Sequence, residues 1–183
     1  MHFEELNPQT RKHMLDEFRS EQRSANPYRP KVLTPDGEAA FVGIMEEHLT
    51  NGTESTLMVA LSEPKFWVER GVRNTKKGPV PYFLPAEQRA KVFALTDFNT
   101  WYVRALCRIL IEAGITDCEG YRAEVAYEPR GECSNLEGLI LSVEEVYRGH
   151  RARYYPEETK NPDALSIPVG PNCHHSIRRR SGR

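Results

Sequence analysis

The sequence predicts an α+β fold in which a helical amino-terminal half and a long central helix pack on a small, mostly antiparallel sheet from the carboxyl-terminal half. Apolar residues recur at helical spacing over most of the chain up to Gly114, whereas the predicted strands concentrate after it. Helices that precede strands in this way do not form the regular alternation of parallel α/β folds. We expect one globular domain over residues 1–178 and a frayed basic tail over residues 179–183.

The strongest helix signal lies at residues 97–114, and we expect this helix to organise the rest of the chain. Thr96 or Asp97 can cap its amino end, and Gly114 can adopt the left-handed conformation that ends many helices. The apolar residues between them recur at helical spacing, so one face must be buried. Residues 85–95 are expected to form a separate helix, set off by Thr96 and Asp97.

Three shorter helices are expected in the amino-terminal half, at residues 7–24, 34–51 and roughly 53–61. The first two begin with Asn7 and Thr34, capping residues that are each followed by a proline, which suits the first helical turn. Between the first two helices, closely spaced prolines favour extended backbone, and we expect a brief strand at residues 31–33.

A basic segment, Arg70–Gly78, interrupts the helical pattern. It lies between two apolar segments, Phe66–Val68 and Val80–Phe83, which we interpret as short strands around a glycine-containing loop. Prolines at 79 and 81 confine the second strand to an edge. The loop is either a mobile surface or a contact site.

The remaining strands are expected after the central helix. Residues 118–127 alternate most clearly and predict the longest strand. A short strand at residues 139–141 precedes Ser142, which matches a capping box that opens a helix. Residues 165–168 and 173–178 are expected to form the last two strands.

The composition indicates a folded protein with a polar, hydrated surface. The chain has 183 residues, of which 39% are hydrophobic and 28% charged, enough to bury a core without disulfides. No basic segment is followed by an apolar run at the amino end, and no window is apolar enough to span a bilayer, so we expect a cytoplasmic protein without membrane contact.

Charge is distributed unevenly along the chain. Residues 1–60 hold 10 acidic and 6 basic residues, whereas residues 147–183 hold 3 and 8. A basic carboxyl end on a mildly acidic body can attract a polyanion or an acidic partner, or it can be a solvated tail.

The first candidate site is a surface of arginine, tyrosine and histidine side chains. Arg104 and Arg108 lie one helical turn apart, and the order helix, loop, strand predicts Arg122 near the end of the central helix. Guanidinium groups grip phosphate oxygens in pairs, and tyrosines can stack on bases. The candidate binding residues are Arg104, Arg108, Arg122, Arg130, Tyr147, His150, Arg151, Arg153 and His174.

A structural interpretation of the same arginines competes with this one. Arg104 and Arg122 could bridge internal carboxylates such as Glu112 or Glu124, with the other arginines in solvent. The sequence leaves both interpretations open.

Metal binding is a weaker interpretation of the cysteines and histidines. The four cysteines form no C-x-x-C pair, so we expect reduced thiols. Cys133, His150, Cys173 and one further histidine could provide zinc ligands, but their spacing matches no known site. His174 and His175 would point to opposite faces of a strand. We therefore expect no metal and no cofactor.

Catalysis is a third interpretation. His150 or His174 could act with Glu124, Glu128 or Glu132 and an arginine in nucleotide or phosphodiester chemistry. The sequence contains none of the glycine-rich, nucleophile-elbow or metalloprotease motifs. It therefore assigns no catalytic residue, and Cys107 is expected in the core.

Several short pieces of the second half resemble those of uncharacterised bacterial proteins of similar size. The pieces are Phe98-Asn-x-x-Tyr102-x-Arg104-x-Leu106, Tyr121-Arg-Ala123, Pro129-Arg130 and Gly170-Pro-Asn172. The resemblance covers residues 97–179 and implies a bacterial or bacteriophage setting, but no activity. The double histidine departs from the pattern.

The leading functional hypothesis is a noncatalytic module that binds nucleic acid or another phosphorylated or acidic partner, such as an acidic protein. One alternative is an enzyme that processes nucleotides or nucleic acid. The other is a subunit of a phage particle or bacterial complex, in which residues 65–85 and the basic tail contact neighbouring subunits of a homo-oligomer.

Overall fold

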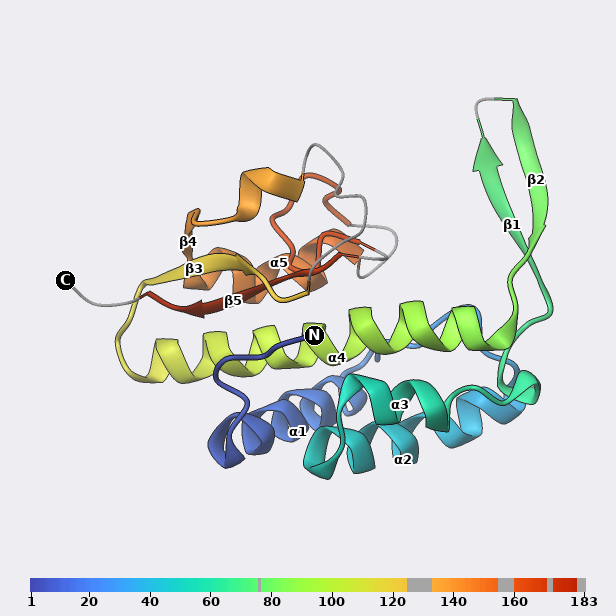
Figure 1. Ribbon diagram of the computed structural model, residues 1–183, viewed down its shortest axis with the longest axis horizontal. Helices are drawn as coiled ribbons and strands as arrows, with labels where there is room; N and C mark the ends of the chain where they lie inside the picture. The colour runs from blue at the N-terminus through green and yellow to red at the C-terminus, as the bar shows by residue number, and fades with distance from the viewer. Residues whose placement is uncertain (76, 125–132, 155–159, 171–172, 181–183) are drawn as a thin grey trace.

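The computed structural model has the predicted α+β architecture. It describes residues 1–75, 77–124, 133–154, 160–170 and 173–180. A long central helix, α4 (Ala86–Glu112), lies between a layer of shorter helices and a small sheet (Figure 1). A two-stranded hairpin extends away from both layers (Figure 1).

The helical layer begins at the residues that the sequence predicts as caps. Asn7 Oδ1 accepts a hydrogen bond from the Thr10 amide at 3.0 Å, and Thr34 Oγ1 accepts one from the Gly37 amide at 3.1 Å. A capping box joins Thr53 and Thr56 at the start of the third helix. The helices are α1 (Pro8–Gln22), α2 (Pro35–Asn51) and α3 (Glu54–Ala60).

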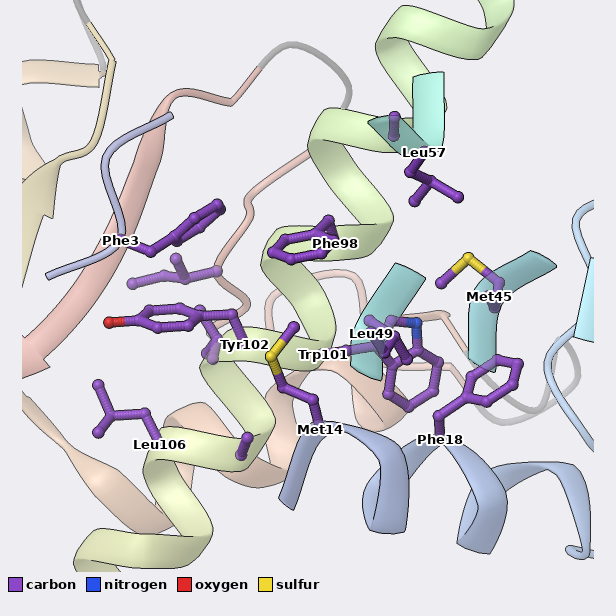
Figure 2. Close-up of a cluster of buried hydrophobic side chains, with 14 of the residues drawn as sticks. Phe3, Met14, Phe18, Met45, Leu49, Leu57, Phe98, Trp101, Tyr102 and Leu106 are labelled. Atoms are coloured by element: carbon purple, nitrogen blue, oxygen red, sulfur yellow. The ribbon is translucent and has the colours of Figure 1, made fainter. Parts of the chain in front are cut away.

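The hydrophobic core surrounds α4 and includes side chains of the helical layer, part of which Figure 2 shows, as well as side chains of the sheet and of α5 (Val143–Tyr154). Phe98, Trp101 and Leu106 are fully buried, which confirms the predicted apolar face of the central helix. Phe18 of α1 meets Trp101 edge to face, with ring centroids 5.1 Å apart. Burial of each such side chain contributes about 1.5–3 kcal/mol, so packing against α1 to α3 holds α4 in place.

The prediction of two helices separated at Thr96 and Asp97 is wrong, because α4 passes through both residues without a break. Thr96 donates its hydroxyl to the Val92 carbonyl at 2.9 Å, one turn back in the same helix. Asp97 is only 5% exposed. Neither proline nor glycine occurs between Ala86 and Glu112, so nothing in the backbone ends the helix.

The sheet is antiparallel throughout, with strand order β4-β3-β5. Gly114, at φ +69°, ends the helical region as predicted and lets the chain reverse. The strands are β3 (Asp117–Arg122), β4 (Ile140–Ser142) and β5 (His175–Arg179). Because β5 reaches Arg179, the sheet enters the segment predicted as a tail.

Two predicted strands differ from the structure. The strand predicted at residues 118–127 ends at Arg122, and residues 125–127 lie outside the described part of the chain. Residues 165–168 form no strand. They pack instead against α5 (Val143–Tyr154), whose amide at Glu145 donates to the predicted cap, Ser142 Oγ, at 3.3 Å.

Gly149 allows this close approach of residues 165–168 to α5. A Cβ atom at Gly149 would lie 1.3 Å from the Leu165 carbonyl oxygen. The segment after α5 therefore returns directly over the helix, where a side chain would block it.

The basic segment predicted as a loop forms the hairpin itself. Its strands are β1 (Arg70–Thr75) and β2 (Gly78–Phe83), which pair only with each other among the described residues. Phe66 belongs to the short 3₁₀ helix η1 (Pro64–Phe66), and the strand predicted at residues 31–33 is a single bridge between Leu33 and Trp67.

No helix in the described part of the chain has an apolar stretch that could cross a membrane.

A further short 3₁₀ helix, η2 (Cys133–Leu136), precedes β4.

Candidate anion-binding site

Arg104, the central residue of the predicted arginine surface, forms ion pairs with acidic side chains inside the protein. Its side chain is 11% exposed and donates to Glu17 Oε2 from Nε at 3.1 Å and from Nη2 at 2.8 Å. Its Nη1 donates to Glu21 Oε2 at 3.2 Å. Both acids lie on α1, so Arg104 joins α4 to α1 instead of facing a ligand.

Glu21 extends this network toward α5 and the chain after α1. Arg151 Nη1 lies 3.1 Å from Glu21 Oε1, and the Tyr28 amide donates to the same oxygen at 3.1 Å. Arg151 also donates to the Asn26 carbonyl at 3.2 Å. One buried carboxylate thus fixes the position of the segment that contains Tyr28 relative to α4 and α5.

Glu17 also contacts two other predicted binding residues, Tyr147 and Arg108. The Tyr147 hydroxyl donates to Glu17 Oε1 at 2.9 Å, and Arg108 Nη1 lies 3.7 Å from the same oxygen. Arg108 also pairs with Glu112 on its own helix at 2.8 Å. Burial and the nearby Glu17 carboxylate raise the pKa of Tyr147, so its hydroxyl stays protonated and donates.

Arg122 lies apart from this network, and its prediction near the end of the central helix is wrong. The turn at Gly114 reverses the chain, and β3 carries Arg122 back along α4 until it pairs with His175. Its Nε donates to Glu137 Oε1 at 2.7 Å. Arg130 lies outside the described residues.

The adjacent histidines differ in burial, and only His175 belongs to β5. His175 is fully buried, and Nε2 lies 3.6 Å from Glu137 Oε1, while His174 is half-buried. Burial and the nearby Arg122 lower the pKa of His175. The Cys173 thiol lies 4.0 Å from His175 Nδ1, but it is itself buried. No group of three or more metal-ligating side chains occurs within the described segments.

The internal carboxylate interpretation is therefore correct for Arg104, although the acids are Glu17 and Glu21 rather than Glu112 or Glu124. Arg122 also pairs with an acid, but this acid is Glu137, which is 42% exposed and not internal. Those predicted residues that the structure describes do not form one surface that faces solvent. Two of them, His150 and Arg153, instead line a cavity.

This cavity has a volume of about 720 Å³, which is within the range of sites for small organic ligands. It lies between α4, the carboxyl end of α5, residues 28–32 after α1 and residues 160–170 after α5. Its lining residues are Tyr28, Pro30, Lys31, Val32, Phe93, Thr96, Thr100, His150, Arg153, Lys160, Pro162, Pro168 and Gly170.

The wall from α4 is one stripe of the helix. Phe93, Thr96 and Thr100 are spaced by three and four residues, so they project on one side. The hydroxyl of Thr100 donates to the Thr96 carbonyl at 2.9 Å. With that proton already donated, its oxygen offers lone pairs to a ligand, and Phe93 offers an apolar surface.

Positive charge surrounds the cavity. Lys31, Arg153 and Lys160 each carry a cation at its lining. Arg153 Nη1 donates to the Ala164 carbonyl at 3.4 Å, which places the guanidinium beside the returning segment. Cations from three separate parts of the chain thus meet at one cavity.

His150 is neutral at physiological pH. Burial lowers its pKa to about 3, and the nearby cations of Arg104 and Arg151 act in the same direction. Its ring lies 6.0 Å from the ring of Tyr28 at an interplanar angle of 76°. The two rings form an aromatic corner of the cavity without adding a charge.

Asp97 lies behind Tyr28 and is uncharged at neutral pH. Burial raises its pKa to about 8, although the hydrogen bond with the Tyr28 hydroxyl acts in the opposite direction. The carboxyl group therefore contributes little negative charge near the cavity at pH 7.

Comparisons of the chain with protein-family models, curated proteins and solved structures found no match.

Most of the cavity was not predicted from the sequence. The stripe of Phe93, Thr96 and Thr100 is a local signal, but the prediction used Thr96 as a helix cap. Tyr28 and Lys31 lie about 60 residues earlier in the chain, and no local pattern indicates that they meet α4. The proximity of these segments follows from the packing of α1 on α4.

Proposed function

We propose that this protein works by binding an organic anion, a compound with an apolar body and a phosphate, sulfonate or carboxylate group, in the cavity beside α4 and α5. One observation supports the proposal above all others. Lys31, Arg153 and Lys160 line a cavity whose walls are otherwise largely apolar. Cations beside apolar walls suit such a ligand, because the walls take its body and the cations take its anionic group.

The arginine network supports this function by holding the cavity wall in place. Glu21 accepts a hydrogen bond from the Tyr28 amide and lies against Arg104 and Arg151. A wall that is already positioned loses little conformational entropy when a ligand enters. Arg104 and Arg151, which were expected to contact the partner, therefore act indirectly by fixing the cavity wall, whereas Arg153 lines the cavity itself.

Two matched fluorescent probes test the proposal. Anilinonaphthalene sulfonate carries a sulfonate, and N-phenylnaphthylamine has the same aromatic body without it. We expect the sulfonate to bind about tenfold or more tightly, since a hydrogen bond to a charged group contributes about 1.5–3 kcal/mol. Equal affinity for the two probes would contradict the role of the cations.

Nuclear magnetic resonance can identify the site that the sulfonate occupies. We expect the largest amide shift changes at Thr96 and Thr100, whose side chains line the cavity. A second groove of about 430 Å³, lined by residues that include Lys12 and Arg108, provides an internal comparison. Shift changes centred on that groove would place the binding elsewhere and refute the proposed site.

A further inference from the structure

The hairpin of β1 and β2 has a composition unlike the rest of the molecule. Residues 70–83 contain four basic residues and no acidic residue, although the whole chain has a net charge of −1. The basic residues are Arg70, Arg73, Lys76 and Lys77. Positive charge is therefore concentrated on the element that extends away from the helices (Figure 1).

One face of the hairpin exposes large apolar side chains beside this charge. Arg70 pairs with Phe83 across the two strands, and Val72 pairs with Pro81, so these four residues share a face. Val72 is 67% exposed and Phe83 is 65% exposed. Such exposure on an element outside the core suggests a contact with another molecule.

The base of the hairpin is fixed to the central helix. Arg89 of α4 donates to the Leu84 carbonyl at 2.9 Å and to the Glu69 carbonyl at 3.4 Å, on either side of the base. Its guanidinium lies 5.6 Å from the centre of the Tyr82 ring. The direction of the hairpin is thus set by contacts that a partner does not have to provide.

The shape of the hairpin suits the major groove of DNA. Six paired residues on each strand span roughly 20 Å at about 3.3 Å per residue. A two-stranded ribbon enters the major groove of B-form DNA, which is about 12 Å wide, whereas the major groove of RNA is too narrow for it. Cations can then contact phosphates, and apolar side chains such as those of Val72 and Phe83 can contact thymine methyl groups.

We propose that the β1–β2 hairpin is a contact surface for double-stranded DNA. Charge favours this partner over a second copy of the same hairpin, because two segments that each carry four cations and no anion repel one another. The surface is separate from the cavity beside α5, and neither proposal depends on the other.

Fluorescence anisotropy with a labelled DNA duplex tests the proposal in the full-length protein. The double variant Arg70→Gln and Lys77→Gln removes two hairpin cations and leaves Gly78, whose φ of +113° shapes the turn, in place. We expect binding to weaken roughly tenfold or more, and the slope of log affinity against log salt to fall by about 1.8, because each phosphate contact contributes about 0.9.

A matched variant removes the same charge from the helices. Lys12 of α1 is 76% exposed and Arg148 of α5 is 75% exposed, so Lys12→Gln with Arg148→Gln should leave affinity and salt slope nearly unchanged. An equal loss in this control would refute a specific role for the hairpin, as would absence of duplex binding by the unmodified protein. Equal affinity for single-stranded DNA or for duplex RNA would refute the groove contact. Self-association without DNA binding would identify the hairpin as an assembly surface instead.

Discussion

Arg104 donates two hydrogen bonds to one oxygen of Glu17, from Nε at 3.1 Å and from Nη2 at 2.8 Å, across the contact between α4 and α1. Both side chains are nearly buried, at 11% and 7% exposure. Because the desolvated charges are compensated mainly by each other and by Glu21, loss of either one leaves an uncompensated charge in the interior.

We expect Glu17→Gln to lower the free energy of unfolding by about 3–5 kcal/mol, the cost of removing one partner from a buried ion pair. Chemical denaturation at pH 7 measures this difference. Glu112→Gln is the matched control, because Glu112 also pairs with an arginine but is 48% exposed. The control should leave stability nearly unchanged, since an exposed ion pair contributes little, and a similar loss in both variants would contradict the buried network.

Because of Asp97, we expect the free energy of unfolding to fall as pH rises. Its pKa is about 8 in the folded protein against an ordinary value of 3.8, so between these values the folded state holds a proton that the unfolded state has lost. Stability therefore decreases as pH rises through this range. His150 acts oppositely, since a folded pKa of about 3 against 6.5 removes stability as pH falls below 6.5.

Between pH 6.5 and 8, Asp97 contributes to the pH dependence of stability and His150 does not. There we expect the unmodified protein to lose up to about 1.4 kcal/mol of unfolding free energy per pH unit. Asp97→Asn keeps an oxygen that can accept from Tyr28 but cannot ionise, and its stability should be nearly constant over the range. Thermal or chemical unfolding at several pH values measures both slopes, and parallel slopes would show that Asp97 does not titrate as described.

Gly149 allows residues 160–170 to cover α5, and an alanine there should be costly. Because a Cβ atom would lie 1.3 Å from the Leu165 carbonyl, the returning segment must shift. We expect Gly149→Ala to destabilise the protein by about 1–3 kcal/mol or more. It should also weaken binding of anilinonaphthalene sulfonate, since Pro168 and Gly170 of that segment line the cavity.

Gly43 provides the matched comparison, because it lies inside α2 and a Cβ atom there would meet nothing within 4 Å. Gly43→Ala should stabilise the protein by about 0.5–1 kcal/mol through its effect on helix propensity. If both alanine variants changed stability alike, close packing at Gly149 would not be the cause.

Local features of the fold were predictable from the sequence. Asn7, Thr34 and Ser142 act as helix caps, and Gly114 ends the central region in the left-handed conformation. Each of these contacts joins residues within a few positions of one another. A local pattern therefore contains all the information that is needed.

Features that depend on distant contacts were predicted less well. The continuity of α4 through Thr96 and Asp97 depends on burial against other helices, which overrides the tendency of both residues to cap. The ion pairs of Arg104 and Arg108 depend on acidic residues of α1. A signal was present, since Glu17 and Glu21 lie one helical turn apart, as do the two arginines, but nothing in the sequence shows that α1 and α4 are neighbours.

The cavity illustrates the same limit for the candidate site. His150 and Arg153 were named as binding residues, and both line it. Lys31 and Tyr28 were not named, because they lie more than 100 residues earlier in the chain and reach the cavity only through the packing of α1. Charge and composition indicated an anionic partner, whereas tertiary structure determined where the cations meet.

The central claim is that cations at the cavity bind an organic anion, and the affinity of anilinonaphthalene sulfonate for a charge-removed cavity tests it most directly. Lys31→Gln with Arg153→Gln removes two lining cations, while Lys12→Gln with Arg148→Gln removes two exposed cations from the helices. We predict that the cavity variant, folded as judged by its unfolding transition, binds the probe about tenfold or more weakly, and that the helix variant binds it normally. Unchanged affinity in the cavity variant, or an equal loss in both, would contradict the account.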